Sequence, residues 1–228
     1  PREGHLREVY HMFSFLKSKH NAVMVFDPTV SEIDDSSFQD RDRSATAYGD
    51  CKEDKPSNAS LPRGLGFIMR AFVDSDHAGD QVTRRSRTGF LVYLNNALIY
   101  WCSKKQTTVE TSSFGSEFMA MKHATEYVRG LRYKLRSMGI PVDECAYIYG
   151  DNKSVLVNSG TPHSQLKKKS NSVAYHHCRE GSALDEWRTT YINTHENIAD
   201  LMTKNLPSGA KRTKFCEMLL HFLKPSEE

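Results

Sequence analysis

Between Phe67 and Leu223 short apolar runs alternate with amphipathic segments, and this order limits the chain to a mixed α/β fold. Strands are predicted at 66–75, 88–96, 97–105, 146–151 and 187–194. Helices are predicted at 110–139, 152–160, 170–184, 197–206 and 209–223. The turn-prone pair Asn95–Asn96 joins the second and third strands into a hairpin. We therefore expect a five-stranded mixed sheet flanked by helices.

The sequence before this pattern has two parts. Residues 5–17 carry apolar side chains at helical spacing, and 22–27 are typical of a short strand. From 28 to 66 the chain is rich in Ser and Asp and has almost no aliphatic residues. Such composition predicts a polar linker or surface insertion that is largely disordered. The expected division is thus 1–27, 28–66 and 67–228.

The bulk composition is that of an ordinary globular protein, with 38% hydrophobic and 26% charged residues among 228. No apolar stretch approaches the roughly 18 residues of a membrane span, and no signal-like N-terminus is visible. The first residue is Pro1 rather than Met, which indicates a piece of a longer chain. Five widely separated cysteines argue against a disulfide framework or structural zinc and favour a reducing intracellular setting.

Four acids fall where predicted strands end or helices begin: Asp74, Glu117, Asp151 and Asp200. Taken singly, an acid at a helix start is a common cap or dipole partner. Glu117, however, lies one turn before Met121 on the core-facing side of the long helix, where an ionised carboxylate is costly without a cation. If the first and fourth strands are adjacent and parallel, these acids converge at one edge of the sheet.

Converging carboxylates require a divalent metal, because like charges at that density cannot all remain ionised without one. Oxygen ligands alone favour Mg²⁺ or Mn²⁺, and a pair of such ions is suited to in-line phosphodiester displacement. Basic clusters occur at Arg84, Arg85 and Arg87, at Lys104 and Lys105, and at Lys167 to Lys169. Basic clusters around an acidic centre favour a polyanionic substrate. We expect Arg84, Arg85, Lys104 and Lys105 to contact a nucleic-acid backbone.

Several motifs between Asp74 and Pro207 occur in a characteristic order: "DSDHAGD", "RRSRTGFLVYL", "IYWCSKKQTTVETSSFGSEFMAM", "IYGDNKSV", "YHHCRE" and "NIADLMTKNLP". Together they resemble the ribonuclease H domain of copia-type (Pseudoviridae) retrotransposon Pol polyproteins. The N-terminal "GHLREVYHMFSFLKSKH" resembles the end of the preceding reverse transcriptase region. His77 departs from the family pattern, which usually has Trp at that position.

The resemblance implies a ribonuclease H-like fold and an endonuclease that hydrolyses the RNA strand of RNA/DNA hybrids during reverse transcription. It makes Asp74, Glu117, Asp151 and Asp200 the catalytic ligands of two Mg²⁺ ions, with Mn²⁺ as an alternative. The implied partners are the hybrid and the reverse transcriptase region of the same polyprotein, with no membrane. The implied location is the cytoplasm, in a virus-like particle, with the nucleus as a second compartment.

Two other functions remain open from the sequence. An integrase or transposase core would use Asp74, Asp151 and Glu186, although Glu186 falls between a helix and a strand. A non-catalytic domain that packs on the reverse transcriptase and holds the hybrid would have the same fold without metal dependence. Asp76 is expected to be either a neighbour of the metal ligands or a loop acid, and His195 an exposed loop residue.

Overall fold

The computed structural model describes residues 3–38, 43, 46–49, 51–142, 144–162, 165–166 and 169–223. Its elements are α1 (Glu3–Ser18), β1 (Ala22–Val23), η1 (Asp35–Ser37), β2 (Met69–Asp76), β3 (Arg87–Leu94), β4 (Ala97–Lys105), α2 (Ser113–Ser137), β5 (Ala146–Gly150), α3 (Lys153–Gly160), η2 (Lys169–Asn171), α4 (Ser172–Ala183), β6 (Trp187–Tyr191), α5 (Asp200–Thr203), α6 (Ala210–Leu219) and β7 (His221–Phe222). The predicted succession of strands and helices from Phe67 onward is confirmed. Within the described residues, no helix has the length and apolar character needed to cross a membrane.

The main sheet has five strands in the order β4-β3-β2-β5-β6. β2 and β3 pair antiparallel, as do β3 and β4, whereas β5 runs parallel to both β2 and β6. The predicted hairpin turns at Asn95, whose φ of 53° lies in the left-handed region that Asn tolerates. Because β2 and β5 are adjacent and parallel, their C-terminal ends lie at the same edge of the sheet.

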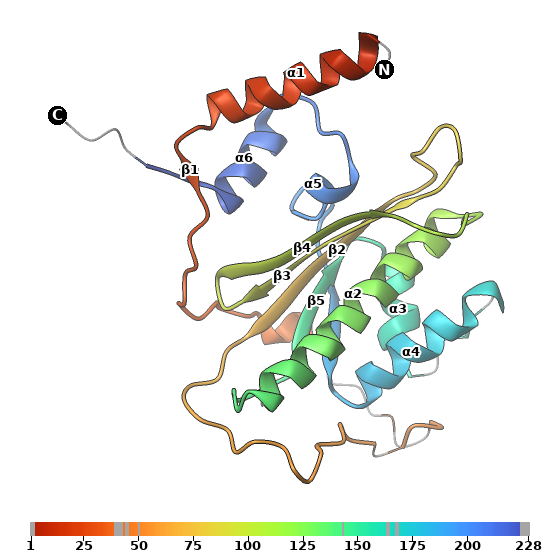
Figure 1. Ribbon diagram of the computed structural model, residues 1–228. Coiled ribbons are helices and arrows are strands. Elements are labelled where there is room, and N and C mark those ends of the chain that lie inside the picture. The colour runs from red at the N-terminus through yellow and green to blue at the C-terminus, as the bar shows by residue number, and fades with distance from the viewer. Residues whose placement is uncertain are drawn as a thin grey trace.

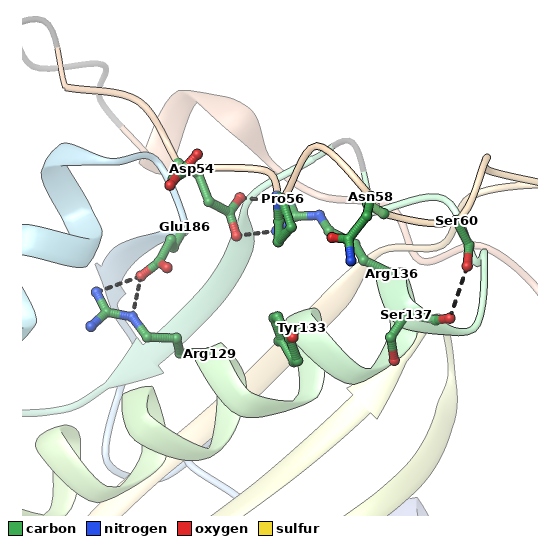
Figure 2. A pocket seen from close by; sticks show the side chains of 11 residues that line it. Asp54, Pro56, Asn58, Ser60, Arg129, Tyr133, Arg136, Ser137 and Glu186 are labelled. Atoms are coloured by element: carbon green, nitrogen blue, oxygen red, sulfur yellow. Dashed lines mark hydrogen bonds and ion pairs between the residues drawn. The ribbon is translucent and has the colours of Figure 1, made fainter.

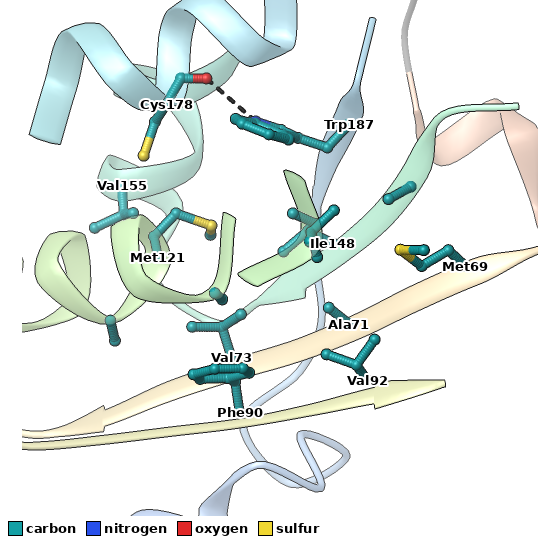
Figure 3. Packing of buried hydrophobic residues seen from close by; sticks show 14 of the residues in the cluster. Met69, Ala71, Val73, Phe90, Val92, Met121, Ile148, Val155, Cys178 and Trp187 are labelled. Carbon is teal, nitrogen blue, oxygen red and sulfur yellow. Dashed lines mark hydrogen bonds between the residues drawn. The ribbon is translucent and has the colours of Figure 1, made fainter. Parts of the chain in front are cut away.

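Both faces of the sheet are covered, with α2, α3 and α4 on one side and α5 and α6 on the other (Figure 1). β3 shows how the sequence produces this, because successive side chains of a strand point to opposite faces. Phe90 and Val92 pack in the larger core beneath α2, which also contains Met121 (Figure 3). Leu91 and Tyr93 pack against the α5–α6 side. A strand buried on both faces explains the nearly continuous apolar run.

The ends of the chain differ from the prediction. The strand expected at 22–27 is limited to β1, and the helix expected at 209–223 ends at Leu219. The residues after that helix instead form β7, which pairs antiparallel with β1. The helix expected at 197–206 is limited to α5. In β7, pairing with a distant segment overrode the local helical pattern. Sequence periodicity cannot predict such pairing.

Segment 28–66 was expected to be largely disordered, but described residues in it pack on the domain. Phe38 is 4% exposed, with its ring edge-on to Tyr147 and Tyr149 at centroid distances of 4.8 and 5.5 Å. The Arg43 guanidinium donates to the backbone oxygen of Gly160 at 2.8 Å. The expectation of disorder is therefore wrong for these residues. The assignment of 28–66 as a linker or insertion stays a prediction.

A third contact of this segment is an ion-pair group that we call the Glu53 cluster, made of Glu53, Arg132 and Arg136. Glu53 Oε2 accepts from Arg132 at 2.8 Å and from Arg136 at 2.6 Å. The three side chains are 15%, 2% and 14% exposed. Burial acts to raise the pKa of Glu53, but hydrogen bonds from Arg136 and Arg132 outweigh it and lower this pKa to about 2.

The Glu53 cluster borders a cleft between residues 53–60 and the C-terminal half of α2 (Figure 2). Arg129 and Glu186 form an ion pair at 2.7 Å on one side of this cleft. On the other side the Ser60 hydroxyl donates to the Ser137 carbonyl oxygen at 3.1 Å. The segment is thus attached along the end of α2 that is opposite to Glu117.

Candidate active site

Asp74 and Asp151 are placed side by side by strand pairing. Val73 pairs with Gly150 across the parallel strands β2 and β5, so the residue that follows each one extends to the same edge. Asp74 is fully buried and Asp151 is half-buried. The side chain that caps α3 belongs to Asn152, whose Oδ1 accepts from the Val155 amide at 3.2 Å. Helix capping therefore does not account for Asp151.

Glu117 reaches the same place from α2. The helix begins after Ser112, whose hydroxyl accepts from the Gly115 amide at 3.2 Å. Glu117 comes early in the helix and is half-buried. One ligand oxygen from each of Asp74, Glu117 and Asp151 lies within 4.8 Å of the others. We call these three residues the acidic cluster.

The electrostatics of the acidic cluster disfavour three negative charges. Burial raises the pKa of Glu117 to about 9, and the charges of Asp74 and Asp151 add to the shift. Burial also raises the pKa of Asp74 to about 6, although Lys204 and the Thr203 hydroxyl act in the opposite direction. At neutral pH the cluster therefore has affinity for a positive charge, which a proton or a cation can supply.

The fourth predicted acid, Asp200, arrives on α5. The Asn197 side chain donates to the Val73 carbonyl oxygen at 2.9 Å and so fastens the residues before α5 to β2. Another contact is with β3, where a Cβ on Gly89 would lie 2.4 Å from Thr203 Cγ2. Glycine at this position lets α5 approach closely enough for the Thr203 hydroxyl to donate to Asp74.

Asp200 is fully buried, and both of its oxygens accept from lysines. Lys204 Nζ lies 2.5 Å from Oδ1, and Lys211 pairs with Oδ2. Lys204 also lies 3.2 Å from Asp74 Oδ1. The structure thus brings three of the four predicted acids together and holds the fourth beside them in ion pairs. Their role as metal ligands stays a prediction.

Neighbouring acids have separate tasks. Asp76 ends β2 and is half-buried, but it is not among the three acids whose ligand atoms converge. Asp80 organises the β2–β3 loop by accepting from the Val82 and Thr83 amides at 3.0 and 3.2 Å. Its ion pair with Lys105, followed by the hydrogen bonds in the loop, lowers its pKa. Asp80 therefore acts as a turn residue.

The residues predicted to contact nucleic acid lie around this loop and the end of β4. Arg84, Arg85, Lys104 and Lys105 are exposed. Strand pairing sets Lys104 opposite Thr88, so the two pairs lie at the same end of the β3–β4 hairpin. Lys105 differs from Lys104 in being paired with Asp80. Lys167 and Lys168 of the third basic cluster lie outside the described residues.

The structure also tests two further residues named from the sequence. His195 is exposed in the loop before α5, as expected. Glu186, the third acid of the integrase interpretation, is 5% exposed and bound to Arg129 beside the Glu53 cluster. It is not part of the acidic cluster. The arrangement needed for that interpretation is therefore not formed.

Five residues that contact or position the acids were not identified from the sequence: Gln106, Asn197, Thr203, Lys204 and Lys211. Gln106 is 2% exposed and donates to the Ser116 carbonyl oxygen at 2.9 Å, next to Glu117. All except Lys211 lie inside the motifs "SKKQTTVETSS" and "NIADLMTKNLP". The signal that could have identified them is that they are polar residues inside these motifs, at positions that no helical or strand periodicity explains.

A mixed sheet of this order and these directions, with helices on both faces and acids at the ends of its adjacent parallel strands, is a ribonuclease H-like fold, as predicted. The retrovirus-related Pol polyprotein from transposon RE1 of Arabidopsis thaliana is 30% identical over 150 residues, 66% of this chain and 10% of the relative. The corresponding polyprotein from transposon TNT 1-94 of Nicotiana tabacum is 31% identical over 152 residues, 67% of this chain and 11% of the relative. The chain is homologous to these transposon Pol polyproteins, which confirms the predicted resemblance to the copia-type family.

The chain spans about a tenth of the length of these relatives. No protein-family model matches it. Among solved structures, RNase H1 from the archaeon Halobacterium salinarum aligns with a TM-score of 0.46 at 14% identity, covering 60% of this chain and 94% of that one. The fold assignment rests on the strand order and directions and not on this alignment.

Proposed function

We propose that this chain is a metal-dependent ribonuclease H that hydrolyses the RNA strand of RNA/DNA hybrids during retrotransposon reverse transcription. The observation that carries the proposal is the acidic cluster. Three carboxylates from β2, α2 and the end of β5 converge at one edge of a ribonuclease H-like sheet. A domain that only packs or holds nucleic acid has no need of such an arrangement, whose mutual repulsion opposes folding.

The donors fit divalent ions. All three are carboxylates, which are hard ligands that suit Mg²⁺ and Mn²⁺. The pKa values of Asp74 and Glu117 are raised because their ionised forms are unfavourable here, and a bound cation would stabilise those forms. Asp74, Glu117 and Asp151 would hold one ion, and Asp200 is the proposed fourth ligand for a second. When bound, two such ions supply the charge that activates water and stabilises the leaving oxygen in phosphodiester hydrolysis.

The chain's own residues would position the substrate. Exposed Arg84, Arg85, Lys104 and Lys105 offer charge to phosphates, which fixes the register of a nucleic acid without reading its bases. The RNA strand would be distinguished by its shape and 2′-hydroxyls. The reverse transcriptase region of the same polyprotein is the proposed protein partner. The proposed location is the cytoplasm, within a virus-like particle, and the nucleus.

The test is cleavage of an RNA/DNA hybrid labelled on each strand, in Mg²⁺, in Mn²⁺ and with a chelator. Asp151→Asn removes one ligand and is expected to lower the cleavage rate by more than about 100-fold, since even residues that only orient metal ligands are worth 10–100-fold. Asp185→Asn is the matched control, because Asp185 is exposed and its φ of 55° suits Asn. It is expected to cleave like the original chain.

Cutting of the RNA strand that requires metal and is lost in Asp151→Asn would support the hydrolase. Tight hybrid binding without cutting, unchanged by chelator, would favour the non-catalytic holding function. A chain that cuts only when joined to its polymerase region would be recognised by repeating the assay with that region attached.

A further inference from the structure

Lys204 follows α5 directly, and its ammonium group lies between two buried carboxylates. Nζ is 2.5 Å from Asp200 Oδ1 and 3.2 Å from Asp74 Oδ1. Both acids are fully buried, whereas the lysine side chain is 35% exposed. The lysine therefore brings a positive charge from the protein surface into the place where these acids face each other.

Every oxygen of the two acids already has a donor. Asp74 Oδ2 accepts from the Thr203 hydroxyl, and Asp200 Oδ2 accepts from Lys211. Lys211 is held in turn by the Thr194 carbonyl oxygen at 2.9 Å. The remaining oxygen of each acid is bound to Lys204. An ion bound between these two Oδ1 atoms would take the position that the Lys204 ammonium group occupies.

Asp74 is also a member of the acidic cluster, whose other two acids make no ion pair among the described residues. The four predicted acids are thus divided by charge. Glu117 and Asp151 have no lysine or arginine partner in the described part of the chain, while the Asp74–Asp200 side holds a cation of the protein itself. Without Lys204 two buried like charges would face one another there, which is unfavourable unless another cation replaces it.

We propose that Lys204 occupies the place of the second divalent ion. In the absence of nucleic acid the chain binds one divalent ion, at the acidic cluster, and a second ion binds between Asp74 and Asp200 only when the Lys204 ammonium group leaves. This inference rests on the proposed metal site. It makes Lys204 a residue that controls how many ions the site holds.

The experiment counts Mn²⁺ bound to the chain by equilibrium dialysis, with the free ion measured by electron paramagnetic resonance. The original chain is expected to bind one ion and Lys204→Met two, since Met keeps most of the stem and removes the charge. Lys204→Arg keeps the charge and is expected to bind one ion. Combining Lys204→Met with Asp200→Asn should return the count to one.

Lys211→Met is the matched control, because it removes a lysine from the same acid without opening the side shared with Asp74. It is expected to bind one ion. Circular dichroism of each variant checks folding, and Lys204→Gln is the substitute if Lys204→Met does not fold.

Two ions of similar affinity in the original chain, or one ion in Lys204→Met, would overturn the inference. Equal gains in Lys204→Met and Lys211→Met would also overturn it, by pointing to overall charge instead of the bridge. No ion in any variant would contradict the proposed metal site as well. The expected counts without any hybrid cleavage would leave this inference standing and contradict the hydrolase alone.

Discussion

The acidic cluster and the Glu53 cluster both bury carboxylates against α2, one near each end of the helix. Glu117 and Arg136 are separated by roughly 28 Å of helix at 1.5 Å per residue. In the acidic cluster, carboxylates face carboxylates, and burial raises the pKa of Glu117 to about 9. In the Glu53 cluster one carboxylate faces two guanidinium groups, and its pKa falls to about 2.

The difference distinguishes a buried acid that stabilises the fold from one that is proposed to bind a metal ion. Burial disfavours the charge in both places. At Glu53, hydrogen bonds from Arg132 and Arg136 more than compensate, so the ionised form holds segment 51–60 on the domain. At Glu117 no arginine or lysine binds the carboxylate within the described part of the chain, and the site retains affinity for an external cation.

The largest expected effect is that the same Glu-to-Gln substitution lowers stability in the Glu53 cluster and cleavage in the acidic cluster. Glu53→Gln leaves Arg132, which is 2% exposed, without its counter-charge and should lower the free energy of unfolding by about 3 kcal/mol. Glu117→Gln removes the cost of keeping a buried carboxyl group protonated beside two other acids, and it should not lower the free energy of unfolding in metal-free buffer at pH 8. In the hybrid assay the order should reverse, with cleavage lost by more than about 100-fold in Glu117→Gln and retained in Glu53→Gln. Urea denaturation and initial cleavage rates measure the two quantities.

Glu217→Gln controls for the substitution itself, because Glu217 is exposed on α6. Its free energy of unfolding should change by less than about 0.5 kcal/mol. The comparison fails if Glu117→Gln destabilises the chain as much as Glu53→Gln does.

A smaller effect per pH unit is expected in the pH dependence of stability without metal. The pKa of Glu117 is about 9 in the folded chain against 4.5 unfolded, so between these pH values the folded state keeps a proton that the unfolded state has lost. Stability should therefore fall as pH rises through this window, by at most about 1.4 kcal/mol per unit. Glu53 has the opposite sign, since its lowered pKa contributes stability that is lost as pH falls from about 4.5 to 2.

Urea denaturation across this range, with chelator present, checks both signs. Glu117→Gln should flatten the decline on the alkaline side, and Glu53→Gln should flatten the decline on the acid side. An alkaline decline of unchanged slope in Glu117→Gln would show that the acidic cluster is not its source.

The smallest effect concerns exposed lysines near the two clusters. Lys104 lies at the hairpin end with the predicted nucleic-acid contacts, whereas Lys134 lies in the last turn of α2, near the Glu53 cluster. Lys104→Ala should weaken hybrid binding a few-fold and reduce the salt dependence by about one ion. Lys134→Ala should change neither. Equal losses of hybrid affinity for both variants in a salt titration would show that the nucleic-acid interface is not at the hairpin end.

Much of the domain was predictable because its determinants are local. Alternation along β2 and β3, the helical stripe through Met121 and the turn at Asn95 set the elements and their order. The convergence of Asp74 and Asp151 then followed, because adjacent parallel strands end at one edge.

Other features depended on residues far apart in the chain. The end of α6 and the start of β7 depend on pairing with β1, about 200 residues earlier. The attachment of segment 28–66 depends on Glu53 meeting Arg132 and Arg136, in a stretch whose composition predicted disorder. No periodicity or motif reports such pairings.

What the sequence determined by itself was the set of elements and the kind of chemistry: acids at strand ends and a helix that turns one acid inward. What only the tertiary structure decided was how those acids are grouped. Asp200 and Lys204 are brought to Asp74 because Gly89 lets α5 approach β3 and Asn197 binds β2. The strength and sign of a buried charge depend on which groups face it, and neighbours in space are set by packing between distant segments, not by spacing along the chain.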